Sequence, residues 1–105
     1  MNAYQKTENL LRNYGAYKLS IELGYPCRLT RACLERIDTA IESLSNRKYI
    51  GIIRMHYIEK MTMEAIAEAY DISVVATYAQ KKKLINALKN ILFSEDAIRE
   101  LLQSE

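Results

Sequence analysis

Three consecutive lysines, Lys81–Lys83, have types and spacing that suit one kind of chemistry, the binding of phosphate groups. Ammonium groups placed along a nucleic-acid backbone neutralise its phosphates and release bound counterions. In a helix these three side chains fan over about 200°, so one of them is expected to pack its stem against the protein. We predict that Lys82 and Lys83 contact phosphates. The alternative is that the three lysines only solvate an exposed helix face.

Side chains in the two helical turns before these lysines have the chemistry needed to contact base edges. Gln80 can pair with the N6 and N7 atoms of adenine, whereas Val75 and Ala79 can contact the thymine methyl group. Hydroxyl groups at helix N-termini can add phosphate contacts, although they also serve as helix caps. The alternative is that these are ordinary exposed helix positions. The predicted DNA-binding residues are Thr62, Ser73, Val74, Val75, Ala79, Gln80, Lys82 and Lys83.

Positive charge is concentrated in the part of the chain that contains these residues. The net charge of the 105 residues is only +2, but residues 46–93 carry eight Lys or Arg against four Asp or Glu. Residues 94–105 carry one against four. This asymmetry favours a nucleic-acid-binding face, although a lysine-rich solvated surface would also show it. Three further cations are candidates for flanking phosphate contacts: Arg47, Lys48 and Arg54.

Two helices are expected to position the candidate DNA-binding side chains. Thr62 is placed to cap a short helix over 63–70, and its hydroxyl can accept a hydrogen bond from the first turn. Ser73 is placed in the same way before a long helix over about 74–93. The connection between the two helices is therefore only about three residues long.

The residues of this short connection are suited to a tight corner. Asp71 is one of the few residue types other than Gly that tolerate a left-handed backbone. Ile72 supplies an apolar side chain to fill the corner, and the small Ala67 allows the second helix to approach the first. Two helices joined by such a turn predict a helix-turn-helix.

The sequence over residues 57–73, YIEKMTMEAIAEAYDIS, resembles region four of bacterial sigma factors. It is more similar to small phage and prophage regulators with a sigma-like C-terminal domain, the ArpU-like and RinA-like group. The stretches KTENLLRNY…KLSIE and ERIDTAIESL resemble the same group, so the similarity covers most of residues 6–92. The resemblance implies a small DNA-binding transcription regulator of a kind that often controls late phage genes.

The resemblance also implies roles for individual residues. The residues that match capping, packing, aromatic or basic positions of the group are Thr62, Ala67, Ile72, Ser73, Tyr78 and Lys81–Lys83. Members often have polar or basic residues at five positions where this chain has Val74, Val75, Ala76, Ala79 and Gln80. Asp71 also replaces the usual Gly. The first turn of the recognition helix therefore offers DNA mainly methyl groups and one amide.

These observations predict a DNA-binding transcriptional regulator that contacts the major groove of double-stranded DNA with the helix starting near Ser73. The alternative is a protein-interaction module that docks on RNA polymerase or a sigma factor and has little DNA affinity of its own. The apolar first turn of the recognition helix favours this alternative. A purely structural helical assembly protein is a third interpretation, and it requires the lysine cluster to be incidental.

The rest of the chain is also predicted to be helical, so the expected fold is an all-α, small helical bundle. Further helices are expected over residues 4–23, 29–45, 46–59 (capped by Ser45-Asn46) and 95–103. We divide this single compact domain into an N-terminal bracing or dimerisation segment (1–45), the helix-turn-helix segment (46–93) and a short C-terminal helix (94–105).

Apolar spacing indicates which faces of these helices are buried. Leu34, Ile37, Ile41 and Leu44 form a seam that packs either on the first helix or on a second copy in a homodimer. The expected core face of the long helix is Tyr78, Ile85, Leu88 and Leu92. The last helix carries a small apolar strip of Ile98, Leu101 and Leu102.

Other functional classes are not supported by the sequence. Cys27 and Cys33 are six residues apart, which is neither a redox pair nor a zinc-ligand spacing, and His56 is the only histidine. We find no catalytic constellation and no phosphate-binding glycine loop, so we expect no enzyme activity, no metal and no cofactor. Apolar runs are too short for a membrane span, and no signal segment is visible, so we expect a cytoplasmic protein.

Overall fold

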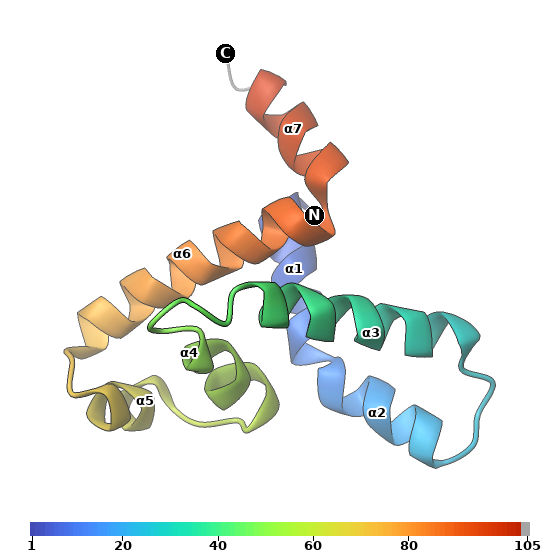
Figure 1. Cartoon of the computed structure of the whole chain (residues 1–105), viewed down its shortest axis with the longest axis horizontal. Helices are drawn as coiled ribbons and strands as arrows, with labels where there is room; N and C mark the ends of the chain where they lie inside the picture. The colour runs from blue at the N-terminus through green and yellow to red at the C-terminus, as the bar shows by residue number, and fades with distance from the viewer. Residues whose placement is uncertain (104–105) are drawn as a thin grey trace.

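The computed structural model describes residues 1–103, and all regular secondary structure within that stretch is helical. This confirms the predicted all-α class. The helices are α1 (Ala3–Arg12), α2 (Tyr14–Glu22), α3 (Arg28–Ser43), α4 (Gly51–Ile53), the π-helix η1 (Arg54–Ile58), α5 (Met63–Tyr70), α6 (Val74–Leu92) and α7 (Ser94–Gln103). In Figure 1, α2 and α3 form a hairpin, α6 runs from the α5 corner past α3 and α1, and α7 projects from the far end of α6. No helix within residues 1–103 has both the length and the apolar character needed to cross a membrane.

The core is formed where α1, α3, α4 and α6 meet. Leu11, Ile37, Ile52, Ile85 and Leu88 are fully buried there and belong to one apolar cluster. The predicted seam of the helix now labelled α3 is buried inside the chain, where α3 packs on α2 and α6. The apolar seam therefore has an intramolecular partner.

The single helix predicted over residues 4–23 is wrong, because the chain forms α1 and α2 with a break at Asn13. The Asn13 side chain donates a hydrogen bond from Nδ2 to the backbone oxygen of Asn9 at 2.8 Å. Side chains of this type compete with the backbone for helical hydrogen bonds. The break changes the direction of the chain, so that α2 pairs with α3.

The helix predicted over residues 46–59 is also wrong in its start and its type. Turns occupy residues 44–50, α4 begins at Gly51, and η1 then completes the segment with a Glu59 N to Arg54 O hydrogen bond of 2.8 Å. A Cβ atom at Gly51 would collide with the hydroxyl of Tyr70 on α5. The start of this segment is therefore set by its packing against α5 and not by the Ser45-Asn46 cap.

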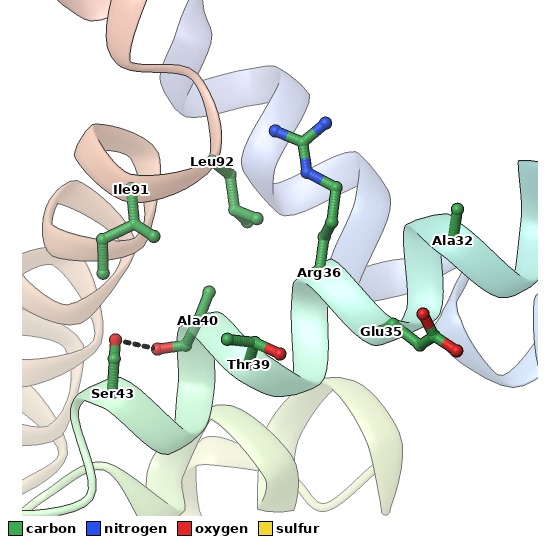
Figure 2. A pocket seen from close by; sticks show the side chains of 8 residues that line it. All are labelled: Ala32, Glu35, Arg36, Thr39, Ala40, Ser43, Ile91 and Leu92. Atoms are coloured by element: carbon green, nitrogen blue, oxygen red, sulfur yellow. Dashed lines mark hydrogen bonds between the residues drawn. The ribbon is translucent and has the colours of Figure 1, made fainter.

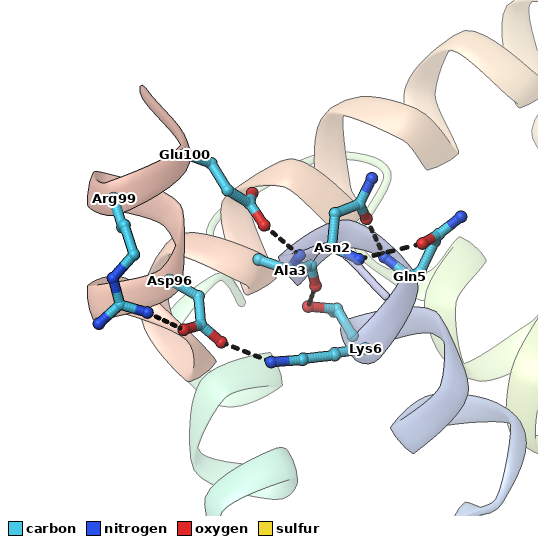
Figure 3. Close-up of polar contacts among 8 residues, drawn as sticks. Asn2, Ala3, Gln5, Lys6, Asp96, Arg99 and Glu100 are labelled. Carbon is cyan, nitrogen blue, oxygen red and sulfur yellow. Dashed lines mark hydrogen bonds and ion pairs between the residues drawn. The ribbon is translucent and has the colours of Figure 1, made fainter. Parts of the chain in front are cut away.

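The last helix, α7, is held to the N-terminus by polar contacts (Figure 3). Lys6 Nζ lies 2.8 Å from Asp96 Oδ2, and the backbone N–H of Ala3 donates to Glu100 Oε1 at 2.8 Å. The hydrogen bond from Lys6 lowers the pKa of Asp96 below its ordinary value. Because α7 is attached on its polar side, its predicted apolar strip remains exposed.

Candidate nucleic-acid interface

The corner between α5 and α6 is formed by the residues that the sequence placed there. Thr62 Oγ1 accepts a hydrogen bond from Ala65 N at 3.1 Å, and Ser73 Oγ accepts one from Ala76 N at 3.0 Å. Asp71 adopts the predicted left-handed conformation, with φ 55° and ψ 47°. Thr62 thus fixes where α5 begins, Asp71 fixes where it ends, and Ser73 fixes where α6 begins.

Backbone hydrogen bonds close the corner on its inner side. Ile72 N donates to Ala67 O at 3.0 Å, and Asp71 N donates to Glu68 O at 3.1 Å. These are the paired bonds of a Schellman motif, which satisfies carbonyl groups at a helix C-terminus. Ala67 is buried and Ile72 is partly buried, as expected for a small residue at a close helix crossing and an apolar residue that fills the corner.

The first half of α6 presents one exposed line of side chains. Val75, Ala79 and Lys82 are all exposed and are spaced i, i+4 and i+7, so they lie within about 60° of one another around the helix. Lys83 is exposed beside this line. We call these four residues the α6 outer face. Two ammonium groups and two apolar side chains therefore share one surface.

The other predicted base-contacting residues do not lie on the α6 outer face. Gln80 is only partly exposed and lies about 140° around the helix from Val75, towards the buried side. Val74 is also partly exposed, about 100° away in the other direction. The structure brings neither side chain onto the line of Val75, Ala79 and Lys82, although both remain at its margins.

The predicted core position of Tyr78 is wrong. Tyr78 is 50% exposed, and Thr77 is fully buried in its place. The Thr77 hydroxyl donates to Ser73 O at 2.9 Å, so its polar group is satisfied inside the helix and it can enter the core. The remaining residues of the predicted core face, Ile85, Leu88 and Leu92, are buried or partly buried.

Lys81 is the lysine of the basic run that packs against the bundle. Its side chain is only 13% exposed, and its Nζ lies 3.9 Å from Glu8 Oε2 on α1. The same ammonium lies over the rings of Tyr57 and Tyr78, 5.8 Å and 5.5 Å from their centroids. The ammonium of Lys81 therefore faces a carboxylate and two aromatic rings within the protein, whereas Lys82 and Lys83 face outward.

Glu8 connects three parts of the chain at this point. Its carboxylate accepts a 2.6 Å hydrogen bond from the Tyr57 hydroxyl and lies 3.3 Å from Arg12 Nη2. Burial, and then the hydrogen bond to Glu8, raise the pKa of Tyr57 well above its ordinary value. The phenol consequently stays protonated and acts as a donor. Residues of α1, η1 and α6 are thus linked through one carboxylate.

Comparison with known proteins places this arrangement in a family. Residues 30–90, more than half of the chain, match the family described as "Protein of unknown function (DUF1492)". The chain belongs to this family. The match begins in α3 and ends in α6, so it includes α5, the corner and the α6 outer face. No curated protein and no solved structure matches the chain.

The three predicted flanking cations of this DUF1492 chain occupy two different places. Arg47 and Lys48 are exposed in the turn before α4, and the neighbouring Tyr49 packs edge-on against Tyr70 at the end of α5, with ring centroids 5.4 Å apart. Their turn therefore lies beside the α5–α6 corner. Arg54 instead lies 3.5 Å from Asp38 Oδ1 on α3.

Sequence reasoning missed the residues that hold Lys81. Glu8 and Tyr57 are 73 and 24 positions from Lys81 in the chain, and no local pattern connects them. Lys81 and Thr77 precede the buried Ile85 by four and eight residues, a spacing that puts all three on the same side of a helix. This spacing is the one signal in the DUF1492 sequence that predicts the burial of Lys81.

Proposed function

We propose that this DUF1492 protein binds double-stranded DNA as a transcriptional regulator. In this proposal α5 and α6 form a helix-turn-helix, and the α6 outer face enters the major groove. One observation carries the proposal: the corner directs outward a surface that combines two exposed lysines with two exposed apolar side chains. Such a surface supplies both an attraction for phosphates and contacts for thymine methyl groups.

The positions of the charged residues support this function. Lys82 and Lys83 are exposed on α6, while Lys81 packs inward beside Glu8. Arg47 and Lys48 are exposed in the turn that lies beside the corner. Exposed cations on α6 and in a turn beside the corner are suited to contact the phosphate backbone that borders a groove. We assign Ser73 and Thr62 to phosphate contacts at the N-termini of α6 and α5.

The composition of the α6 outer face supports a preference for A·T-containing sites. Val75 is 80% exposed and Ala79 is exposed, and neither can donate a hydrogen bond to guanine. The thymine methyl group is the major-groove feature that apolar side chains recognise. Gln80 can add an adenine contact from the margin of this surface. The resemblance to phage and prophage regulators supports a role in the control of phage-encoded genes.

The decisive experiment is selection of DNA by the purified full chain, without polymerase, from random and genomic duplex fragments. Binding is measured at about 50 mM and about 200 mM salt, because attraction to phosphates weakens steeply with salt. We expect an enriched, salt-sensitive motif that contains thymines. Retention of all sequences to the same weak extent would contradict the proposal.

A second candidate function is docking on RNA polymerase or a sigma factor. The observation that favours it is the exposure of Val75 and Tyr78, at 80% and 50%, near the start of α6. Large exposed apolar side chains are typical of protein interfaces. This function predicts that the chain captures polymerase in a pull-down and that a Val75→Asp variant does not, while neither binds isolated DNA.

A further inference from the structure

We infer that the side chains of Asn86 and Lys89 on α6 form a further DNA-binding site, which contacts the phosphate backbone where α6 leaves the major groove. This inference rests on the proposed function, because it concerns the same helix and the same duplex. It adds two residues to the proposed contacts and extends the DNA-binding surface from the first half of α6 towards its last turn.

The exposed line of side chains on α6 continues beyond the α6 outer face. Asn86 lies about 20° around the helix from Val75, and Lys89 lies about 40° from Val75 in the other direction. Lys82 lies between these two side chains in angle. Both Asn86 and Lys89 are partly exposed. One side of α6 can therefore contact a duplex from Val75 to Lys89.

A hydrogen bond between the two side chains makes them a group of donors. Lys89 Nζ donates to Asn86 Oδ1 at 3.1 Å. Because an ammonium group can only donate, the amide oxygen of Asn86 faces Lys89, and the amide nitrogen keeps its two N–H groups for other acceptors. The ammonium group also has further N–H groups to donate. Donors beside a positive charge suit the phosphate oxygens of DNA.

No neighbouring carboxylate neutralises the charge of Lys89. The α6 helix contains four lysines and no acidic residue. Within residues 1–103, Lys81 is the one lysine of α6 that forms an ion pair, and its partner is Glu8. Asp96, in the helix that follows α6, is instead bound by Lys6 at 2.8 Å. Lys89 is therefore available to an external phosphate group.

The length of this line determines which part of the duplex Lys89 reaches. Val75 and Lys89 are 14 residues apart, which is about 21 Å along the helix axis. The major groove of B-form DNA is only about 12 Å wide. A straight helix whose first turns contact base edges has therefore left the groove before residue 89. At that point it lies beside the phosphate backbone that borders the groove, where a cation makes a contact without base specificity.

The opposite side of the same end of α6 is not suited to phosphate groups. There α6 faces α3 across a hollow of about 480 Å³ (Figure 2). Ile91 and Leu92 line this hollow from α6. Its charged lining residues are one acid and one base, Glu35 and Arg36. A phosphate group would meet an apolar surface without net charge here, so the hollow supplies control positions at the same end of the helix.

The test is fluorescence anisotropy of the full chain with a duplex that the wild type selects, at four salt concentrations. Lys89→Gln should make the slope of log K against log salt shallower by about 0.9, the value for one phosphate of B-form DNA. The matched control is Arg36→Gln, which removes one exposed charge from the α3 side and should change the slope by less than about 0.3. Circular dichroism shows whether each variant keeps its helices.

A second pair of variants adds a charge, so that a loss of folding cannot imitate the expected result. Asn86→Lys places another ammonium group on the exposed line and should make the slope steeper by about 0.9. Thr39→Lys adds the same charge at an exposed position of the hollow in Figure 2 and should leave the slope unchanged. Hydroxyl-radical footprinting locates the contact, because Lys89→Gln should lose protection at one edge of the DNA site and keep it at the centre.

Two results would overturn this inference and leave the proposed function intact. One is an unchanged slope for Lys89→Gln. The other is an equal slope change in each variant and its control, which would mean that only net charge matters. In both cases the wild type still binds DNA. A wild type without salt-sensitive DNA binding would instead overturn the proposed function and this inference together.

Discussion

Removal of the two exposed lysines should change how DNA binding depends on salt. Lys82 and Lys83 are exposed on α6, and in the proposed complex each neutralises one phosphate. Each neutralised phosphate contributes about 0.9 to the slope of log K against log salt for B-form DNA. The Lys82→Ala/Lys83→Ala variant should therefore bind with a slope shallower by about 1.8.

This slope change predicts a measurable dependence of the mutational effect on salt. Between 50 mM and 200 mM salt, a slope difference of about 1.8 corresponds to a factor of about ten in affinity. The ratio of wild-type affinity to variant affinity should therefore be about ten times larger at 50 mM salt than at 200 mM salt. The loss should be similar for all DNA sequences, because phosphate contacts carry no base information.

Lys81 provides an internal control within the same basic run. Its side chain is 13% exposed and its Nζ lies 3.9 Å from Glu8 Oε2, so its ammonium faces the protein and not the proposed DNA surface. Lys81→Met keeps the packed stem and removes the same formal charge, and it should leave the salt slope within about 0.3 of the wild type. Lys18→Ala, at an exposed position on α2, controls for net charge away from the interface.

The assay is fluorescence anisotropy with one labelled duplex at four salt concentrations, using the full chain and all three variants. The refuting result is a slope change for Lys81→Met, and for Lys18→Ala, of about half that of Lys82→Ala/Lys83→Ala, which would mean that only net charge matters. An unchanged slope in the double variant would remove Lys82 and Lys83 from the interface altogether.

Three stability predictions concern the residues that shape the corner and its support. Asp71→Val should destabilise the protein by about 1–2 kcal/mol in urea denaturation, because a β-branched residue tolerates a φ of 55° poorly, whereas Asp71→Gly should not. Gly51→Ala should lower the melting temperature because its Cβ meets the Tyr70 hydroxyl, and adding Tyr70→Phe should restore most of the loss. The folded state raises the pKa of the buried Tyr57 phenol, so above pH ~10 only the unfolded chain loses this proton readily. The free energy of unfolding should therefore fall by up to about 1.4 kcal/mol per pH unit above pH ~10. In denaturation measured against pH, Tyr57→Phe should reduce this slope.

The α5–α6 region could be predicted almost to the residue because its signals are local. A helix over 63–70 was predicted and is found, and a helix over 74–93 was predicted where α6 covers Val74–Leu92. Thr62, Ser73 and Asp71 fix these boundaries through hydrogen bonds and backbone preferences within a few residues of each helix end. Such signals do not depend on the rest of the fold.

The errors occurred where contacts distant in sequence decide the structure. The start of α4 is set by Tyr70, which packs over Gly51, and the apparent cap at Ser45-Asn46 is not used. A left-handed Lys60 and the π-turn before it accompany this packing, and neither has a distinctive sequence pattern. The amide of Gln80 has the chemistry of an adenine contact, but the helix turns this side chain towards the margin of the outer face, and residue type alone does not reveal that direction.

The basic run shows why the N-terminal segment matters to the candidate interface. Lys81 is bound to Glu8 of α1, and the same carboxylate accepts the hydrogen bond from Tyr57 of η1. One acidic group thus ties the start of the chain to the helix that carries the outer face and to the segment that precedes α5. Without α1, Lys81 and the Tyr57 hydroxyl would each lose this carboxylate, and α6 would lose the helix that packs against it. The angle at which α6 presents Val75, Ala79 and Lys82 is therefore determined by residues outside the α5–α6 pair. A fragment that begins after α3 would contain every predicted DNA-contacting side chain but not the packing that orients them.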